Sequence, residues 1–156
     1  LRALGIARPR ALEAWDERYA VRDTGEPARI EGVRGVWRVD PDRLADLADF
    51  AGRTAVLSPL DRLVFDRKRM EDVFGFDYQL EMYKPAAERR WGYWAMPVLD
   101  GDELVGKVDA TADREGGVLI VDAVHEDGDW SAARRRRVDV ELDGLGEWLG
   151  LEVVRP

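Results

Sequence analysis

The sequence predicts an α+β protein: a partial winged-helix module over residues 1–54, then a helix and an antiparallel β-meander or barrel-like domain with a C-terminal helix over residues 55–156. Three observations support this prediction. Helical and short strand patterns alternate in the first part, strand-like runs joined by short turns fill the second, and residues 131–149 carry an apolar helical stripe. A chain of 156 residues is long enough to bury a core.

The first segment combines a helix with a two-stranded arm. Apolar residues recur at helical spacing over residues 9–21, and residues 28–33 and 36–39 are short strand patterns around a glycine-containing turn. A helix followed by such an arm is the second half of a winged-helix module, whose arm contacts the phosphate backbone of DNA. The basic residues of the arm are therefore candidate phosphate contacts: Arg29, Arg34 and Arg38.

Two helix starts with proline in the first turn separate the two domains. Asp40 begins one helix as its N-cap, and Gly52 ends it. The domain boundary is predicted in the connector over residues 53–57. Ser58 then caps the next helix, which extends to Gly75.

Arg67 falls on the apolar stripe of this second helix, one heptad after Leu60. A guanidinium on an apolar face needs an anionic partner or a route to solvent. A carboxylate of the β-domain and a DNA phosphate both remain open as that partner.

The segment from Tyr78 to Leu99 is predicted to form a β-hairpin around which the second domain is organised. Alternating runs over residues 78–83 and 91–98 flank a basic connector. Cations beside aromatic rings suit a nucleic-acid groove, because the cation binds phosphate and the ring stacks on a base. The same pattern is also typical of an ordinary hairpin with one solvated face. The basic residues of the connector are Lys84, Arg89 and Arg90.

The remaining chain completes the sheet and adds the last helix. Residues 104–112 and 118–125 are predicted strands, Ser131 caps the helix, and residues 151–154 add an edge strand. Consecutive helical residues point around the axis, so the basic run Arg134–Arg137 is interpreted as a solvated salt-bridge face rather than a flat phosphate site. The bracketing acids are Asp127, Asp129, Asp139 and Glu141, and His125 is predicted to lie in a loop.

Composition excludes several kinds of chemistry. The chain has no cysteine and one histidine, so thiolate metal sites, histidine-based zinc sites and a Ser-His-Asp triad are not expected. A net charge of −8 argues against coating nucleic acid through bulk charge, so any polyanion site must be local. No apolar run predicts a membrane span or signal peptide, which favours a cytoplasmic protein. Because the chain opens at Leu1 within a helical pattern, we expect it to be a fragment of a longer protein.

Four blocks occur in a specific order: L-S-P-L-D-R-L-V-F-D-R-K-R at 57–69, F-G-F-D-Y-Q-L-E-M-Y at 74–83, R-R-W-G-Y-W-A-M-P-V-L at 89–99 and L-V-G-K-V-D-A-T-A-D-R at 104–114. Over about residues 28–125, the chain resembles the C-terminal half of the bacterial winged-helix DNA glycosylases of the YcaQ/AlkZ type. The resemblance implies tandem winged-helix modules followed by a β-barrel-like domain. It also implies removal of alkylated bases and unhooking of interstrand crosslinks at the nucleoid, without a metal or organic cofactor.

The catalytic motif of that family is a glutamine, an apolar residue, then glutamine or aspartate, in the N-terminal half and upstream of the blocks matched here. Gln79-Leu80-Glu81 mimics it superficially, but it lies within a predicted strand, so no catalytic role is transferred and no catalytic residue is predicted in this chain. The resemblance implies instead a DNA-positioning part that binds double-stranded DNA, with no oligomeric state implied. The implied DNA-binding residues are Arg34, Arg67, Lys84, Arg89, Arg90, Trp91, Tyr93 and Trp94. A winged-helix regulator with a ligand-sensing or dimerising β-domain and a structural interaction domain remain open alternatives.

Overall fold

The computed structural model describes residues 6–7, 25–35, 37–42 and 50–155, and the chain divides into two compact units, Leu1–Ala51 and Gly52–Pro156. Each unit is described separately below. The predicted helix over residues 9–21, and the helix from Asp40 beyond residue 42, lie outside the described residues.

The first unit contains a small antiparallel sheet. Its strands are β1 (Ile6–Ala7), β2 (Glu26–Ala28) and β3 (Trp37–Val39), in the order β1-β3-β2. The predicted arm is therefore present as β2 paired with β3, but β2 ends at Ala28 and not at Val33. The reason is a turn in which the Val33 backbone N–H donates to the Ile30 carbonyl at 3.1 Å. This sheet alone does not identify a winged-helix module, because the helices predicted for it fall outside the described residues.

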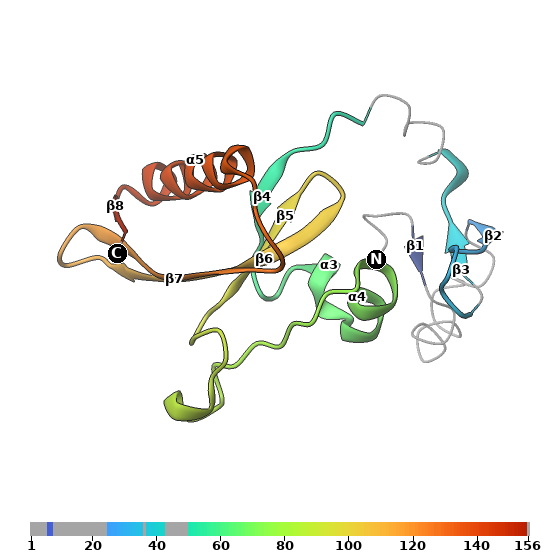
Figure 1. Cartoon of the computed structure of the whole chain (residues 1–156), viewed down its shortest axis with the longest axis horizontal. Coiled ribbons are helices and arrows are strands. Elements are labelled where there is room, and N and C mark those ends of the chain that lie inside the picture. Colours follow the sequence, from blue (N-terminus) through green and yellow to red (C-terminus); the bar gives the residue numbers. More distant parts are fainter. Residues whose placement is uncertain (1–5, 8–24, 36, 43–49, 156) are drawn as a thin grey trace. The chain divides into compact units, whose positions relative to one another are not determined.

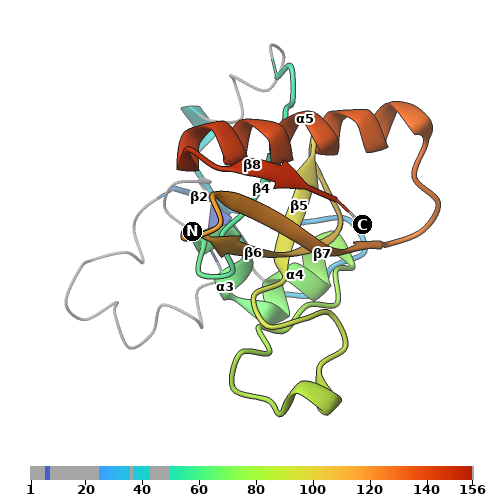
Figure 2. The same ribbon diagram turned by 90° about the vertical axis from the view of Figure 1, so that its left-hand side faces the viewer.

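The second unit is a curled five-stranded sheet with a C-terminal helix. The strand order is β4-β5-β6-β7-β8, antiparallel except for the parallel pair of β7 and β8. The elements are β4 (Thr54–Val56), α3 (Arg62–Phe65), α4 (Arg67–Phe74), η4 (Ala86–Glu88), β5 (Met96–Asp100), β6 (Glu103–Asp113), β7 (Val118–Glu126), α5 (Ala132–Leu149) and β8 (Glu152–Val154). Figure 1 shows the curl of this sheet, and Figure 2 shows α5 lying alongside its edge strand β8.

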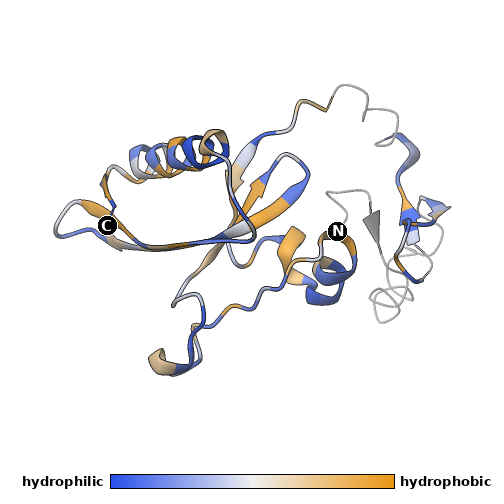
Figure 3. Ribbon diagram, in the orientation of Figure 1, coloured by the Kyte–Doolittle hydropathy of each residue, from blue (hydrophilic) through white to orange (hydrophobic). Residues whose placement is uncertain are grey.

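Helix α5 closes the open side of this half-barrel. It contacts β4 and β8, the two edge strands, and hydrophobic and hydrophilic residues alternate along it (Figure 3). Its inward residues Val138 and Leu142 pack with Trp130 and with valines of β5, β6 and β7. The Ser131 side chain accepts from the Arg134 backbone N–H, which confirms the predicted cap. The long strands β6 and β7 and the edge strand β8 are likewise confirmed.

The predicted hairpin from Tyr78 to Leu99 is wrong. Only Met96–Asp100 is a strand, and its partners are β6 and β4, a strand formed within the predicted connector over residues 53–57. Residues 75–95 form instead an irregular segment, which we call the α4–β5 loop and which contains η4. The alternating pattern that predicted the hairpin reflects burial, because Tyr78 and Trp91 are both buried. Their rings stack on each other, but no strand ladder joins their backbones.

The predicted continuous helix from Ser58 to Phe74 is interrupted at Asp66. Asp61 caps α3 by accepting from the Leu63 backbone N–H at 2.7 Å, and Asp66 caps α4 by accepting from the Arg69 N–H at 3.0 Å. The aspartate caps, and not Ser58, therefore set the helix starts. Among the described helices, none combines the length and apolarity needed to cross a bilayer.

Candidate nucleic-acid interface

The α4–β5 loop carries six of the eight predicted DNA contacts. It projects away from the sheet and from α5 in both Figure 1 and Figure 2. Its two ends continue from α4 and into β5, so the loop is held between regular elements of the second unit. The six residues are Lys84, Arg89, Arg90, Trp91, Tyr93 and Trp94.

The base of the loop is a stack of three aromatic rings. Tyr78 stacks on Phe76 and on Trp91, with 6.1 Å between ring centroids in each pair. Its hydroxyl donates to the Ala95 carbonyl at 2.8 Å, which joins the start of the loop to its end. Burial raises the pKa of Tyr78 far above its usual value, so the phenol remains a hydrogen-bond donor at neutral pH.

Glu81 is a buried carboxylate that holds the two sides of the loop together. It is 1% exposed and accepts from Lys84 Nζ at 2.7 Å, from the Arg90 backbone N–H at 2.7 Å and from the Trp91 N–H at 2.9 Å. Burial acts to raise the pKa of Glu81, but the hydrogen bonds outweigh it and the pKa is lowered. In the predicted hairpin these backbone N–H groups would have donated to a neighbouring strand, and here they donate to Glu81 instead.

Asp109 on β6 anchors the far side of the loop. Its carboxylate accepts from the Tyr93 backbone N–H at 3.2 Å and from the Trp94 N–H at 3.1 Å. Between these contacts and Glu81 lies Gly92, with φ of 130°, where an added methyl group would lie 1.7 Å from Asp109 Oδ2. Only glycine both adopts this backbone conformation and leaves room for the carboxylate.

Trp91 belongs to the core in this structure. Its side chain is 8% exposed, and its ring lies 4.3 Å from the Arg90 guanidinium carbon and 4.8 Å from Lys107 Nζ. Lys107 is itself buried, and its ammonium pairs with Asp127 Oδ2 at 2.6 Å. The exposed rings of the loop are Tyr83 and Tyr93, with 88% and 51% exposure, while Trp94 is half-buried.

The three basic side chains of the loop differ in their partners. Lys84 pairs with Glu81, and Arg90 Nη1 pairs with Asp77 Oδ2 at 2.9 Å, with both members exposed. Arg89 donates from Nε to the Lys84 carbonyl and lies 5.0 Å from the Tyr93 ring, with no carboxylate partner among the described residues. An exposed pair such as Arg90–Asp77 is worth little, so a phosphate can replace the aspartate at small cost.

Arg67 and Arg34 lie outside this loop. Arg67 is the exposed first residue of α4, and the buried arginine of that helix is Arg69, whose Nη2 donates to the Leu63 carbonyl at 2.6 Å. The prediction that Arg67 lies on the apolar face is therefore wrong, because the break at Asp66 changes the helical phase. Arg34 is exposed between β2 and β3 of the first unit.

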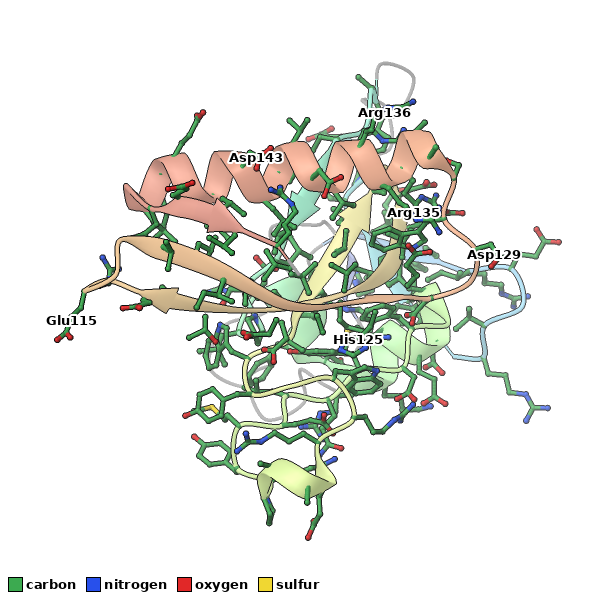
Figure 4. All side chains as sticks on the ribbon, turned by 60° about the vertical axis from the view of Figure 1, so that its left-hand side comes forward. Glu115, His125, Asp129, Arg135, Arg136 and Asp143 are labelled. Atoms are coloured by element: carbon green, nitrogen blue, oxygen red, sulfur yellow. The ribbon has the colours of Figure 1, made fainter. Side chains whose placement is uncertain are left out.

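The predicted salt-bridge face on α5 is confirmed for Arg134, Arg135 and Arg137, although with different acids, and Arg136 forms no ion pair with a described residue. Arg134 pairs with Asp100 and Glu103, Arg135 pairs with Glu126, and Arg137 pairs with Asp100. These carboxylates come from the β5–β6 region and from β7, because α5 packs over the sheet and away from the acids nearest in sequence. Figure 4 shows Arg135 and Arg136 on different sides of the helix.

His125 is a strand residue and not a loop residue. It lies on β7 (Figure 4). Its Nε2 is 2.8 Å from the Trp91 carbonyl oxygen, which can only accept, so Nε2 carries the proton. It thereby supports the loop from the sheet. The described residues contain no group of three or more potential metal-ligating side chains.

Sequence reasoning missed Glu81 and Asp109 as structural residues of the loop. The backbone N–H groups that they bind are up to 16 positions away in sequence. Because every residue type except proline has such a group, the sequence does not show which ones are bound. Gly92 was the one local signal, since glycine in an otherwise aromatic run often marks a close approach.

Two comparisons with known proteins bear on this site. A family model described as "DNA glycosylase AlkZ-like" matches residues 1–148 of the chain. No solved structure matches the chain.

Proposed function

Because the chain belongs to the family of AlkZ-like DNA glycosylases, we propose that it positions double-stranded DNA for repair of alkylated or interstrand-crosslinked bases. The contact surface in this proposal is the tip of the α4–β5 loop. The chain would act on DNA at the nucleoid, and its exposed arm residue Arg34 and helix residue Arg67 would add phosphate contacts.

The observation that carries the proposal is the preorganised loop. Glu81, Asp109 and the Tyr78 hydroxyl fix its backbone at separate points, so its tip needs little ordering when it binds. The tip then presents Arg89 stacked on Tyr93, a cation beside an exposed ring. That pair suits a phosphate next to a distorted or unstacked base.

The proposal assigns no part in cleaving the glycosidic bond to Gln79 or Glu81. The only glutamine of the chain is Gln79, and Glu81, which follows it two positions later, is buried and occupied by three donors. In this proposal Glu81 therefore has a structural role in the loop. An alkylated purine is already a cationic leaving group, so positioning water and DNA supplies much of the required catalysis.

Replacement of two loop arginines tests the proposal. The variant R89A/R90A in the full-length protein is expected to weaken binding to an undamaged duplex and to lower the salt slope of log K by about 1.8, roughly 0.9 per lost phosphate contact. The measurement is fluorescence anisotropy across a salt series.

The control is R114A, which removes an exposed arginine at the β6–β7 turn. It should leave the slope unchanged. An unaltered affinity and slope in R89A/R90A would exclude the loop tip as a DNA contact. A wild-type protein without affinity for duplex DNA even at low salt would instead favour a structural interaction domain.

A further inference from the structure

A second basic site lies at the junction of β4 and α5, and the proposed function does not use it. An open groove of about 450 Å³ is lined there by Arg53, Thr54, Arg136, Arg137, Val140 and Glu141, among others. We call it the β4–α5 groove. Its arginines come from segments more than eighty positions apart in sequence, and folding brings them to one surface.

Two of the three arginines in the groove form no ion pair with any described residue. Arg134, Arg135 and Arg137 all pair with carboxylates, but Arg136 makes no ion pair within the described part of the chain. The same holds for Arg53, and both side chains are exposed. Two guanidiniums without a described carboxylate partner therefore line one groove in a chain with a net charge of −8, which makes the groove a local basic site.

Hydrogen bonds to Asp100 hold two of the groove residues, Thr54 and Arg137, in place. Thr54 Oγ1 donates to Asp100 Oδ1 at 2.7 Å, and Arg137 Nε donates to the same oxygen at 2.9 Å. The hydrogen bond from Arg137 is the largest of the effects that hold the pKa of Asp100 far below its usual value, so the carboxylate stays ionised and Arg137 stays fixed. The Arg53 carbonyl accepts from the Gly101 N–H at 3.0 Å, which fixes the backbone from which that side chain extends.

We propose that the β4–α5 groove binds phosphate groups of a nucleic-acid backbone through Arg53 and Arg136, with Arg137 as a fixed third cation. Guanidinium groups present paired N–H donors that match phosphate oxygens. Glu141 makes no ion pair with these arginines in the described structure and opposes an anion at one rim of the groove. This inference rests on the proposed function, since it gives the same DNA a second place of contact.

The groove lies at the opposite end of β5 from the α4–β5 loop. Thr54 pairs with Asp100, the last residue of β5, whereas the loop enters the strand at Met96. The groove and the loop are therefore separate sites, and a variant of one leaves the contacts of the other in place.

The test is the variant R53A/R136A in the full-length protein, with R114A as the matched loss of an exposed arginine elsewhere. The salt slope of duplex binding is expected to fall by about 1.8 relative to wild type, while R114A keeps it. E141Q removes a negative charge from the groove and is expected to tighten duplex binding. Near-ultraviolet circular dichroism and thermal unfolding establish that each variant is folded.

Inorganic phosphate serves as a second probe, because a free phosphate offers the same oxygens as a nucleic acid. If phosphate raises the melting temperature of wild type but not of R53A/R136A, while duplex binding is equal in both, the groove is a small-anion site and the proposal is overturned. An unchanged slope in a folded R53A/R136A, with R89A/R90A still impaired, overturns the groove and leaves the proposed function intact. Absence of duplex binding by wild type overturns both.

Discussion

At the scale of single residues, Glu81 holds the two sides of the α4–β5 loop together. One buried carboxylate fixes a lysine side chain and two backbone amides on the opposite side of the loop. A buried acceptor that satisfies several donors is costly to remove, because each donor then loses its partner away from water. The conformation of the basic tip consequently depends on an acid that would not itself touch DNA.

Glu81→Gln is expected to lower the free energy of unfolding by about 1–3 kcal/mol, because the amide NH₂ must face at least one of the donors. Urea denaturation monitored by tryptophan fluorescence measures this change. The control is Glu88→Gln in the same loop, since Glu88 is exposed on η4. Equal stabilities for the two variants would contradict the role assigned to Glu81.

At the scale of elements, two aspartates decide where the helices before the loop begin. Asp66 ends α3 and starts α4, and its Oδ1 accepts from the Arg69 N–H at 3.0 Å. The guanidinium of Arg69 is buried; burial lowers the pKa of Arg69, while the nearby charges of Asp66 and Asp61 oppose that shift. Asp66 therefore acts both as a cap and as a countercharge.

Asp66→Ala is expected to lower the free energy of unfolding by about 1 kcal/mol through loss of the cap, whereas Asp66→Asn keeps the cap and loses only the charge. Thermal and urea unfolding of both variants measure the two contributions. Equal losses in the two variants would show that the charge, and not the cap, is what stabilises this junction.

At the scale of the whole molecule, the acidic chain keeps its basic sites local. The net charge is −8, yet the loop tip and the β4–α5 groove present arginines with no carboxylate partner among the described residues. Binding through a few local contacts predicts a modest salt slope, in contrast to proteins that coat DNA. Acidic surfaces elsewhere would repel the backbone and restrict the orientation of the duplex.

The free energy of unfolding should fall in acid because Glu81 and Asp100 are buried carboxylates that must be ionised in the folded chain. The pKa values of Glu81 and Asp100 are lowered in the folded chain from ordinary values of 4.5 and 3.8. At a pH between the folded-state and the unfolded-state pKa values, the unfolded chain therefore binds more protons than the folded chain. Their contribution is fully present above about pH 5 and is lost as the pH falls through the folded-state values. Urea denaturation at pH 7, 5, 4 and 3 measures the loss.

Asp100→Asn provides the control for this acid dependence. It removes the carboxylate that Thr54, Arg134 and Arg137 share, so it should be less stable than wild type at pH 7 but lose less stability on going to pH 3. Parallel pH curves for the two proteins would assign the acid dependence to other groups.

Regular elements and the family were accessible from the sequence, because apolar periodicity and caps are local properties of the chain. Strands β6 and β7, helix α5 with its Ser131 cap, and the edge strand β8 were all predicted in this way. The false hairpin arose from the same local signal, since Tyr78 and Trp91 are buried but in a loop. Alternation indicates which residues are buried, and it does not indicate which backbone donors they leave unpaired.

The sequence by itself determined which residues form α5 and the long strands, and to which family the chain belongs. Only the tertiary structure decided that Glu81 and Asp109 anchor the loop, and that Arg53 and Arg136 line the same β4–α5 groove. The physical reason is the range of the interactions. A helix or strand is stabilised by neighbours at fixed spacing, whereas these contacts join residues whose separation in sequence follows no period and depends on the path of the whole chain.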